Sequence, residues 1–124
     1  MLFDWDQHPN GFRITTSGGE FVPRFSRCSA EKIYLLAGAS ERVGAPRHAQ
    51  RFSEVDDPEA LDSWEGHVRT VREGEIGMLA GPNGYVLIKV VKVHDMDRGA
   101  AQNCVEFDYE FRARALWPPS AGPP

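Results

Sequence analysis

The sequence predicts a small, mainly β fold: an antiparallel sheet, rolled or half-barrelled, with one short helix. Residues 74–79 and 85–93 are apolar runs on either side of Gly81-Pro82-Asn83-Gly84. Asn-Gly between apolar runs is the strongest short hairpin signal, and its favoured type I′ turn has positive φ at both central residues. From Val105 to Arg112 apolar and polar residues alternate, which is typical of a strand with one buried face. Residues 86–91 are apolar on both faces, which predicts a central strand covered on both sides.

The first half of the chain predicts a second hairpin. Ser17-Gly18-Gly19 separates two strand-like segments, residues 11–16 and 20–25. Pro23 cannot donate to a ladder, so the second segment is expected at an edge or at a bulge. Residues 29–36 fit either a helix capped by Ser29 or a buried strand, and their second half favours the strand. Residues 38–51 are rich in Gly, Ala, Pro and Arg and are predicted to form a surface loop.

A short helix is predicted at residues 57–64, because Asp57 suits an N-cap and Pro58 the first helical position. Trp64, at the end of that helix, is expected in the core rather than stacked on a ligand. The chain has 124 residues, enough for one domain with its own core. We assign that domain to residues 1–116 and a Pro-rich tail, not expected to fold alone, to residues 117–124.

Composition narrows the classes of function. A formal net charge of −4 argues against general nucleic-acid binding. No apolar run has the length of a membrane span, and the first residues lack the pattern of a secretory signal. These features predict a cytoplasmic protein without a membrane partner. Cys28 and Cys104 stand alone without metal-ligand spacing and are expected to be reduced, and no cofactor is expected.

Two clusters raise the question of metal binding. Asp4, Asp6 and His8 alternate, so on an extended segment they would share a face and could hold a divalent cation, although a solvated strand explains them equally well. Residues 94–97, His-Asp-Met-Asp, are better explained as a polar loop that caps its own backbone. No His lies near a Ser or Cys motif, so no catalytic residue or metal ligand is assigned.

Lys89 is the most conspicuous charged residue of the predicted sheet. If the loop after Val93 is centred near Arg98, Val93 faces Val105, Lys92 faces Glu106 and Lys89 faces Tyr109. This register puts Lys89 on the buried face beside Tyr109. A buried ammonium must reach solvent, pair with a carboxylate or await an anionic ligand.

Several arginines are expected to run beside the same sheet. Guanidinium groups recognise phosphate or carboxylate through paired hydrogen bonds, so their convergence would form an anion pocket. The alternative is that they are scattered over the surface. The candidate ligand-binding set is Arg24, Arg27, Ser29, Arg69, Arg72, Lys89 and Tyr109.

Five short motifs carry a resemblance to a known family. They are Phe-Ser-Arg-Cys-Ser at 25–29, Val-Arg-Thr at 68–70, Gly-Glu-Ile at 74–76, Asn-Gly-Tyr at 83–85 and Val-Glu-Phe-Asp-Tyr at 105–109. Together they resemble a small uncharacterised bacterial domain found alone and beside Toll/interleukin-1-receptor-like (TIR) domains. The resemblance spans roughly residues 12–111. It implies an accessory or sensing module in bacterial defence or stress, and it supplies no catalytic residues.

The function predicted from the sequence is therefore a non-catalytic binding or sensing module. Its expected partner is a small anionic, nucleotide-like ligand or an effector protein, and a second copy of the chain is a further candidate. One alternative is a pure protein-interaction module that uses sheet edges and the Pro-rich tail. Another is a small metal-dependent hydrolase built around Asp and His.

Overall fold

The computed structural model describes residues 1–38, 42–46, 49–58 and 64–113. The predicted tail at 117–124 and the centre of the predicted helix, residues 59–63, lie outside this part. The described chain is built from antiparallel strands that do not close into a barrel, which confirms the predicted mainly β class. Its helical elements with both ends in the described residues are the 3-10 turns η1 (Phe52–Glu54) and η3 (Met96–Arg98), and Pro58 also has 3-10 conformation.

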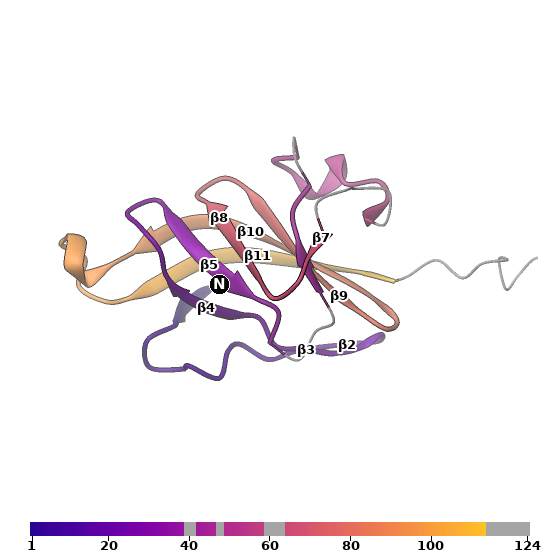
Figure 1. The fold of residues 1–124 in the computed structure, drawn as a ribbon, viewed down its shortest axis with the longest axis horizontal. Coiled ribbons are helices and arrows are strands. Elements are labelled where there is room, and N and C mark those ends of the chain that lie inside the picture. Colours follow the sequence, from indigo (N-terminus) through magenta and orange to yellow (C-terminus); the bar gives the residue numbers. More distant parts are fainter. Residues whose placement is uncertain (39–41, 47–48, 59–63, 114–124) are drawn as a thin grey trace, which may run out of the picture.

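The strands form one large and one small sheet (Figure 1). The large sheet has the order β1-β11-β10-β9-β6-β7, the small sheet has the order β4-β5-β8, and β2 and β3 form a separate hairpin. The bounds are β1 (Leu2–Asp4), β2 (Ile14–Thr16), β3 (Gly19–Phe21), β4 (Arg24–Arg27), β5 (Lys32–Leu36), β6 (Arg42–Gly44), β7 (Trp64–Glu65), β8 (Val68–Arg72), β9 (Ile76–Gly81), β10 (Gly84–His94) and β11 (Cys104–Ala113).

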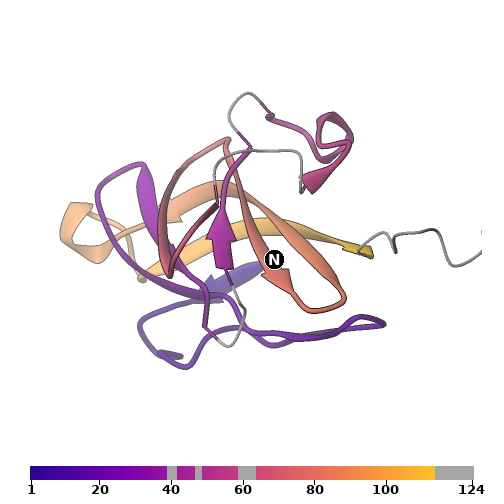
Figure 2. The same cartoon turned by 45° about the vertical axis from the view of Figure 1, so that its right-hand side comes forward.

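The small sheet and the β2–β3 hairpin pack against one face of the large sheet (Figure 2), and the main core lies between them. Val86, Ile88 and Val90 of β10 point into this core. Leu87 points to the opposite face, where a second cluster packs beneath Phe52 of η1. The expectation of a central strand covered on both faces is thus confirmed from Val86 to Ile88, whereas Val91, the last residue of the expected stretch, is 46% exposed.

The close approach of the two sheets depends on a glycine in β9, which has no side chain. A Cβ atom at Gly77 would lie 2.5 Å from Cδ2 of Leu35 and 3.0 Å from Cγ2 of Val71. Leu35 belongs to β5 and Val71 to β8, and both are fully buried. Gly77 therefore lets the small sheet rest directly on the large one.

Two assignments made from the sequence are wrong. The predicted loop at 38–51 contains β6, whose residues 42–44 pair with both β9 and β7. Val43 is fully buried there, so this segment is held by partners distant in sequence rather than by its own propensity. Trp64 does not end a helix, because it begins β7 and pairs with Gly44.

The β9–β10 turn also differs from expectation. Gly81 and Gly84 are cross-strand partners, so the central turn residues are Pro82 and Asn83. Neither has positive φ, and Gly84 is not among the glycines that do. A type I′ turn is excluded because the ring of Pro82 holds φ near about −65° at the first central position. The hairpin itself is confirmed.

A bulge decides which way Lys89 faces. Val93 pairs with Val105 and Lys92 with Glu106, as predicted, but the register shifts between Val90 and Lys92. Beyond this shift Lys89 pairs with Asp108, and Tyr109 pairs with Ile88 instead. The expectation that Lys89 lies beside Tyr109 on the buried face is therefore wrong, because one extra residue turns the remainder of β10 over.

Candidate functional site

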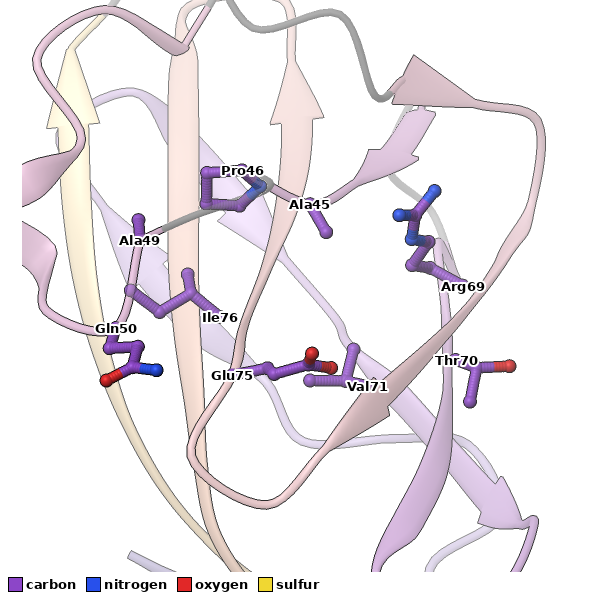
Figure 3. Close-up of a pocket in the computed structure, with 9 residues that line it drawn as sticks. All are labelled: Ala45, Pro46, Ala49, Gln50, Arg69, Thr70, Val71, Glu75 and Ile76. Carbon is purple, nitrogen blue, oxygen red and sulfur yellow. The ribbon is translucent and has the colours of Figure 1, made fainter.

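A cavity of about 310 Å³ opens where β8 separates from β9 (Figure 3). Its wall comes from three stretches of chain: β8, the start of β9, and the segment between β6 and η1. Arg69 and Thr70 lie on one side of the opening and Ala49 and Gln50 on the other. The lining residues are Ala45, Pro46, Ala49, Gln50, Arg69, Thr70, Val71, Glu75 and Ile76.

Glu75 explains why the two strands separate. They are joined by a tight turn, in which the Glu75 N–H donates to the Arg72 carbonyl at 2.9 Å. In a regular hairpin the Arg72 N–H would donate back to the Glu75 carbonyl. Here it donates to the carboxylate Oε1 of Glu75 at 2.9 Å, and the carbonyl accepts from Val90 of β10. The strands are thus released to join different sheets.

This separation leaves one edge of β8 open. Within the described chain β8 pairs with β5 and with no other strand. The Arg72 N–H points away from β5 towards Glu75, whereas the carbonyl of His67 accepts from Ala37 on the β5 side. Because backbone groups alternate along a strand, the N–H and C=O of Val68 and Thr70 point to the open edge.

Arg69 supplies the positive charge of the cavity. It pairs with Leu35 of β5, and cross-strand partners share a face, so its side chain starts from the inner face of the small sheet. It is half-buried. Arg69 also interacts within the chain, and its guanidinium carries five N–H donors in all.

The cavity therefore offers both signs of charge and both kinds of hydrogen-bonding group. Arg69 donates, the carboxylate of Glu75 accepts, and the amide of Gln50 can do either. Among the described residues that line it there is no His, Cys or Ser. Such a wall suits recognition of a ligand that carries a carboxylate or similar anion beside amide or hydroxyl groups.

The structure does not gather the predicted ligand-binding residues in one place. Arg24 and Arg72 are exposed, and alternation along β4 and β8 puts them on the outer face of the small sheet, away from Phe25 and Val71. Ser29 follows β4 and donates its backbone N–H to Lys32. Of the predicted set, only Arg69 lines the cavity.

Arg27 is held by a network at the end of β4, two strands away from β8 in the small sheet. Its Nε lies 3.1 Å from Oδ1 of Asp95, its Nη2 donates to Oδ1 of Asn103 at 3.1 Å, and its Nη1 lies 3.3 Å from Oδ2 of Asp97. The guanidinium also sits over the ring of Trp5, 5.5 Å from the centroid. All three guanidinium nitrogen atoms of Arg27 thus contact oxygen atoms of the protein.

Lys89 and Tyr109 lie on opposite faces of the large sheet. Tyr109 is half-exposed, with its ring 6.2 Å from that of Phe12 and 6.3 Å from that of Phe107 on the core side. Lys89 shares the other face with Leu87, near Glu54, whose pKa its charge helps to lower. Neither side chain lines the cavity.

Glu75, Gln50 and Thr70 were not predicted as site residues. Gln50 and Thr70 carry no local signal, because their place at the cavity depends on where β8 and η1 pack. Glu75 follows Gly74, whose positive φ of 88° marks the turn. A carboxylate directly after such a glycine is the one feature that could have drawn attention to this corner.

The other polar clusters named from the sequence, around Asp4 and Asp95, have structural roles. Oδ1 of Asp4 accepts from the N–H groups of Asp6 and Gln7, and Oδ1 of Asp95 accepts from Asp97; both are carboxylates that cap their own turns. No group of three His, Cys, Asp or Glu residues in the described ranges is placed to hold a metal ion.

One further pair lies on the outer face of the large sheet. Nε2 of His94 lies 3.0 Å from Oε1 of Glu106, and Cys104 is the cross-strand partner of His94. Burial raises the pKa of the Cys104 thiol, with a further contribution from the carboxylate of Asp4. A raised pKa disfavours the thiolate, so this group does not suit a nucleophile. Cys28 and Cys104 are both free.

No protein-family model, curated protein or solved structure matches the chain. The functional assignment therefore rests on the geometry of the cavity. Among the described residues, no helix has the length and apolar character needed to cross a membrane.

Proposed function

We propose that this protein is a non-catalytic binding module and that the cavity beside β8 holds the anionic group of its ligand. The observation that carries the proposal is the half-buried Arg69 in a cavity of about 310 Å³ at an open strand edge. Ligand cavities in proteins start at about 300 Å³, so the space suits a small molecule or a side chain.

The chemistry of the wall narrows the ligand class. One guanidinium matches one carboxylate or monoanionic group through two parallel hydrogen bonds. The carboxylate of Glu75 at the same cavity repels further negative charge and attracts a donor. This balance favours a monoanion that also carries N–H groups over a polyphosphate. A nucleotide-like ligand and a role in bacterial defence or stress remain predictions.

A protein-interaction role is the second candidate. It is favoured by the open edge of β8 and by the exposed apolar side chains of Tyr34 and Val68 beside it. Unpaired backbone groups at an edge accept a strand from another chain.

The test is a thermal-shift screen with acetate, glutarate, N-acetylglutamate, inorganic phosphate and AMP. A ligand that binds only the folded state stabilises it by about 2.7 kcal/mol at a hundred times its dissociation constant. We expect a monocarboxylate with an amide group to raise the melting temperature of the wild type. Arg69→Met should abolish this shift, because Met keeps the aliphatic stem but not the charge.

Arg72→Met is the matched control, since Arg72 lies on the same strand with its side chain on the other face. Its shift should equal that of the wild type. Equal loss in both variants would point to diffuse attraction by surface charge. No shift by any of the anions, in a protein shown to be folded, would overturn the proposed function.

A further inference from the structure

We propose that the ligand is an extended peptide segment that adds to the open edge of β8 as an antiparallel strand and directs a carboxylate at Arg69. This inference rests on the proposed function, because it assigns a ligand class to the same cavity. It is carried by the register of β8, by the direction of its backbone groups, and by the charges next to them.

The backbone of β8 sets how the peptide pairs. Val68 and Thr70 present their N–H and C=O groups to the open edge, whereas those of Arg69 and Val71 are used by β5. The edge ends at Arg72, whose N–H already donates to Glu75. Two hydrogen-bonding residues therefore remain, which suits a peptide of about five residues in an extended conformation. Antiparallel pairing continues the pattern of β5 and is slightly the more stable.

Side-chain alternation then decides what each peptide residue meets. A residue opposite Arg69 shares its face and points towards the cavity. Its two neighbours lie opposite Val68 and Thr70 and point to the outer face. Val68, Thr70 and Tyr34 are exposed there, which favours β-branched neighbours. The edge thus selects an acidic residue between two β-branched ones.

The probe is the peptide acetyl-Thr-Val-Glu-Val-Thr-amide, titrated by calorimetry or by NMR. Its Glu would lie opposite Arg69 and its two Val residues opposite Val68 and Thr70. We expect replacement of Glu by Gln to weaken binding about tenfold, since a charge-assisted pair is lost. A peptide with the sequence acetyl-Thr-Val-Thr-Val and a free C-terminus tests whether a terminal carboxylate serves equally well.

N-methylation separates strand addition from binding of the carboxylate alone. In the antiparallel register the N–H groups of both Val residues face β8, while that of Glu faces away. Methylation of both Val nitrogens removes two hydrogen bonds. It should weaken binding by about tenfold or more, given the usual net contribution of each hydrogen bond. Methylation of the Glu nitrogen should leave the affinity unchanged. Equal loss in both peptides, or loss with Glu alone, would overturn the proposed register.

Hydrogen exchange gives a readout that needs no variant. The Thr70 amide should exchange fast in the free protein and be protected in the complex, because its N–H points to the open edge. The Val71 amide, which faces β5, should be protected in both states. Saturation with the peptide and no added protection at Thr70 would overturn strand addition.

Failure of this inference can be distinguished from failure of the proposed function. If N-acetylglutamate stabilises the wild type through Arg69 but the peptide binds no tighter and is indifferent to N-methylation, the cavity binds small anions and the strand is wrong. If neither stabilises the protein, both are wrong.

Discussion

Arg27 and Asp95 join the two sheets through a salt bridge in which Nε of Arg27 lies 3.1 Å from Oδ1 and 3.2 Å from Oδ2 of the carboxylate. Arg27 ends β4 of the small sheet, and Asp95 follows β10 of the large sheet. The side chain of Asp95 is 2% exposed and that of Arg27 is 41% exposed. The buried carboxylate of Asp95 is therefore neutralised mainly by a guanidinium that water still reaches, and Nε of Arg98 lies 3.8 Å from its Oδ2.

Arg27→Met should destabilise the fold by about 3 kcal/mol, because it leaves the buried carboxylate of Asp95 with only the more distant cation Arg98, whose Nε lies 3.8 Å from Oδ2. The figure is at the lower end for buried pairs because Arg27 is partly hydrated. Urea unfolding measures it. Arg13→Met is the control: Arg13 pairs with Glu20 at 3.3 Å on the surface, so its loss should cost less than about 1 kcal/mol. Equal costs would show that the Arg27 pair contributes no more than a surface pair.

Lys89→Met should leave the fold stable within about 1 kcal/mol and keep the response to carboxylates. Lys89 faces Asp108 across the strands on a hydrated face, where a charge pair contributes little. The cavity is lined by Arg69 and not by Lys89. Thermal-shift measurements with carboxylates on Lys89→Met and on Arg69→Met show which of the two cations binds the anion. Loss of the ligand response in Lys89→Met would place the anion on the outer face of the large sheet instead.

Gly84→Ala should cost about 1–3 kcal/mol, the usual range for overpacking. The added Cβ would lie 2.6 Å from the carbonyl oxygen of Arg112 and 2.5 Å from the ring of Phe111. Backbone cannot move aside as a flexible side chain can, and Gly84→Val should cost more. Gly66→Ala is the control, because its Cβ would meet no atom within 4 Å. A Gly84→Ala protein with wild-type stability would contradict the close pairing of β10 and β11 at this end.

Glu54→Gln should loosen the segment around η1 at neutral pH and have no effect in acid. The N–H groups of Gln50 and Arg51 donate to Oε1 of Glu54 at 2.8 and 2.9 Å and lower the pKa of its carboxyl below the usual 4.5, with help from the charges of Arg51 and Lys89. A lowered pKa means that the unfolded state binds more protons. The stabilisation is therefore present above pH 4.5 and is lost as the pH falls through the folded-state pKa.

Hydrogen exchange of the Gln50 and Arg51 amides, followed against pH, measures this effect. Asp56→Asn, an exposed neighbour, is the control and should leave both amides as protected as in the wild type. Protection that is independent of pH in the wild type would show that the charge of Glu54 is not what holds the turn.

Cys104 should react with a thiol reagent only slowly in the native protein, and much more slowly than Cys28. Cys104 is buried, and burial raises its pKa, so both access and thiolate content are low. Cys28 is partly exposed. The single variants Cys28→Ser and Cys104→Ser isolate each thiol, and mild denaturant should abolish the difference. Comparable native rates would indicate that β11 opens at this end.

The hairpin of β9 and β10 could be predicted because its signals are local. Turn residues separate two apolar runs, and the alternation from Val105 to Phe111 reports one buried face. The pairing of Lys92 with Glu106 followed from the same pattern. The bulge at Val91 could not be predicted in this way, because Val91 fits a regular strand as well as a bulged one. Only the packing of β10 and β11 against the core selects the bulged form. The bulge in turn decides on which face of the sheet Lys89 lies.

The sequence by itself determined the mainly antiparallel β class, the hairpins and the apolar faces, because these depend on residues close together along the chain. The tertiary structure decided three other features: that Arg42–Gly44 forms a strand, that β8 joins β5 rather than β9, and that Arg69 borders a cavity. Each depends on which distant segment supplies the partner. For the pairing of β8 and the position of Arg69, the partner is decided at Glu75. Its carboxylate accepts the hydrogen bond from the Arg72 N–H that its backbone carbonyl would accept in a regular hairpin.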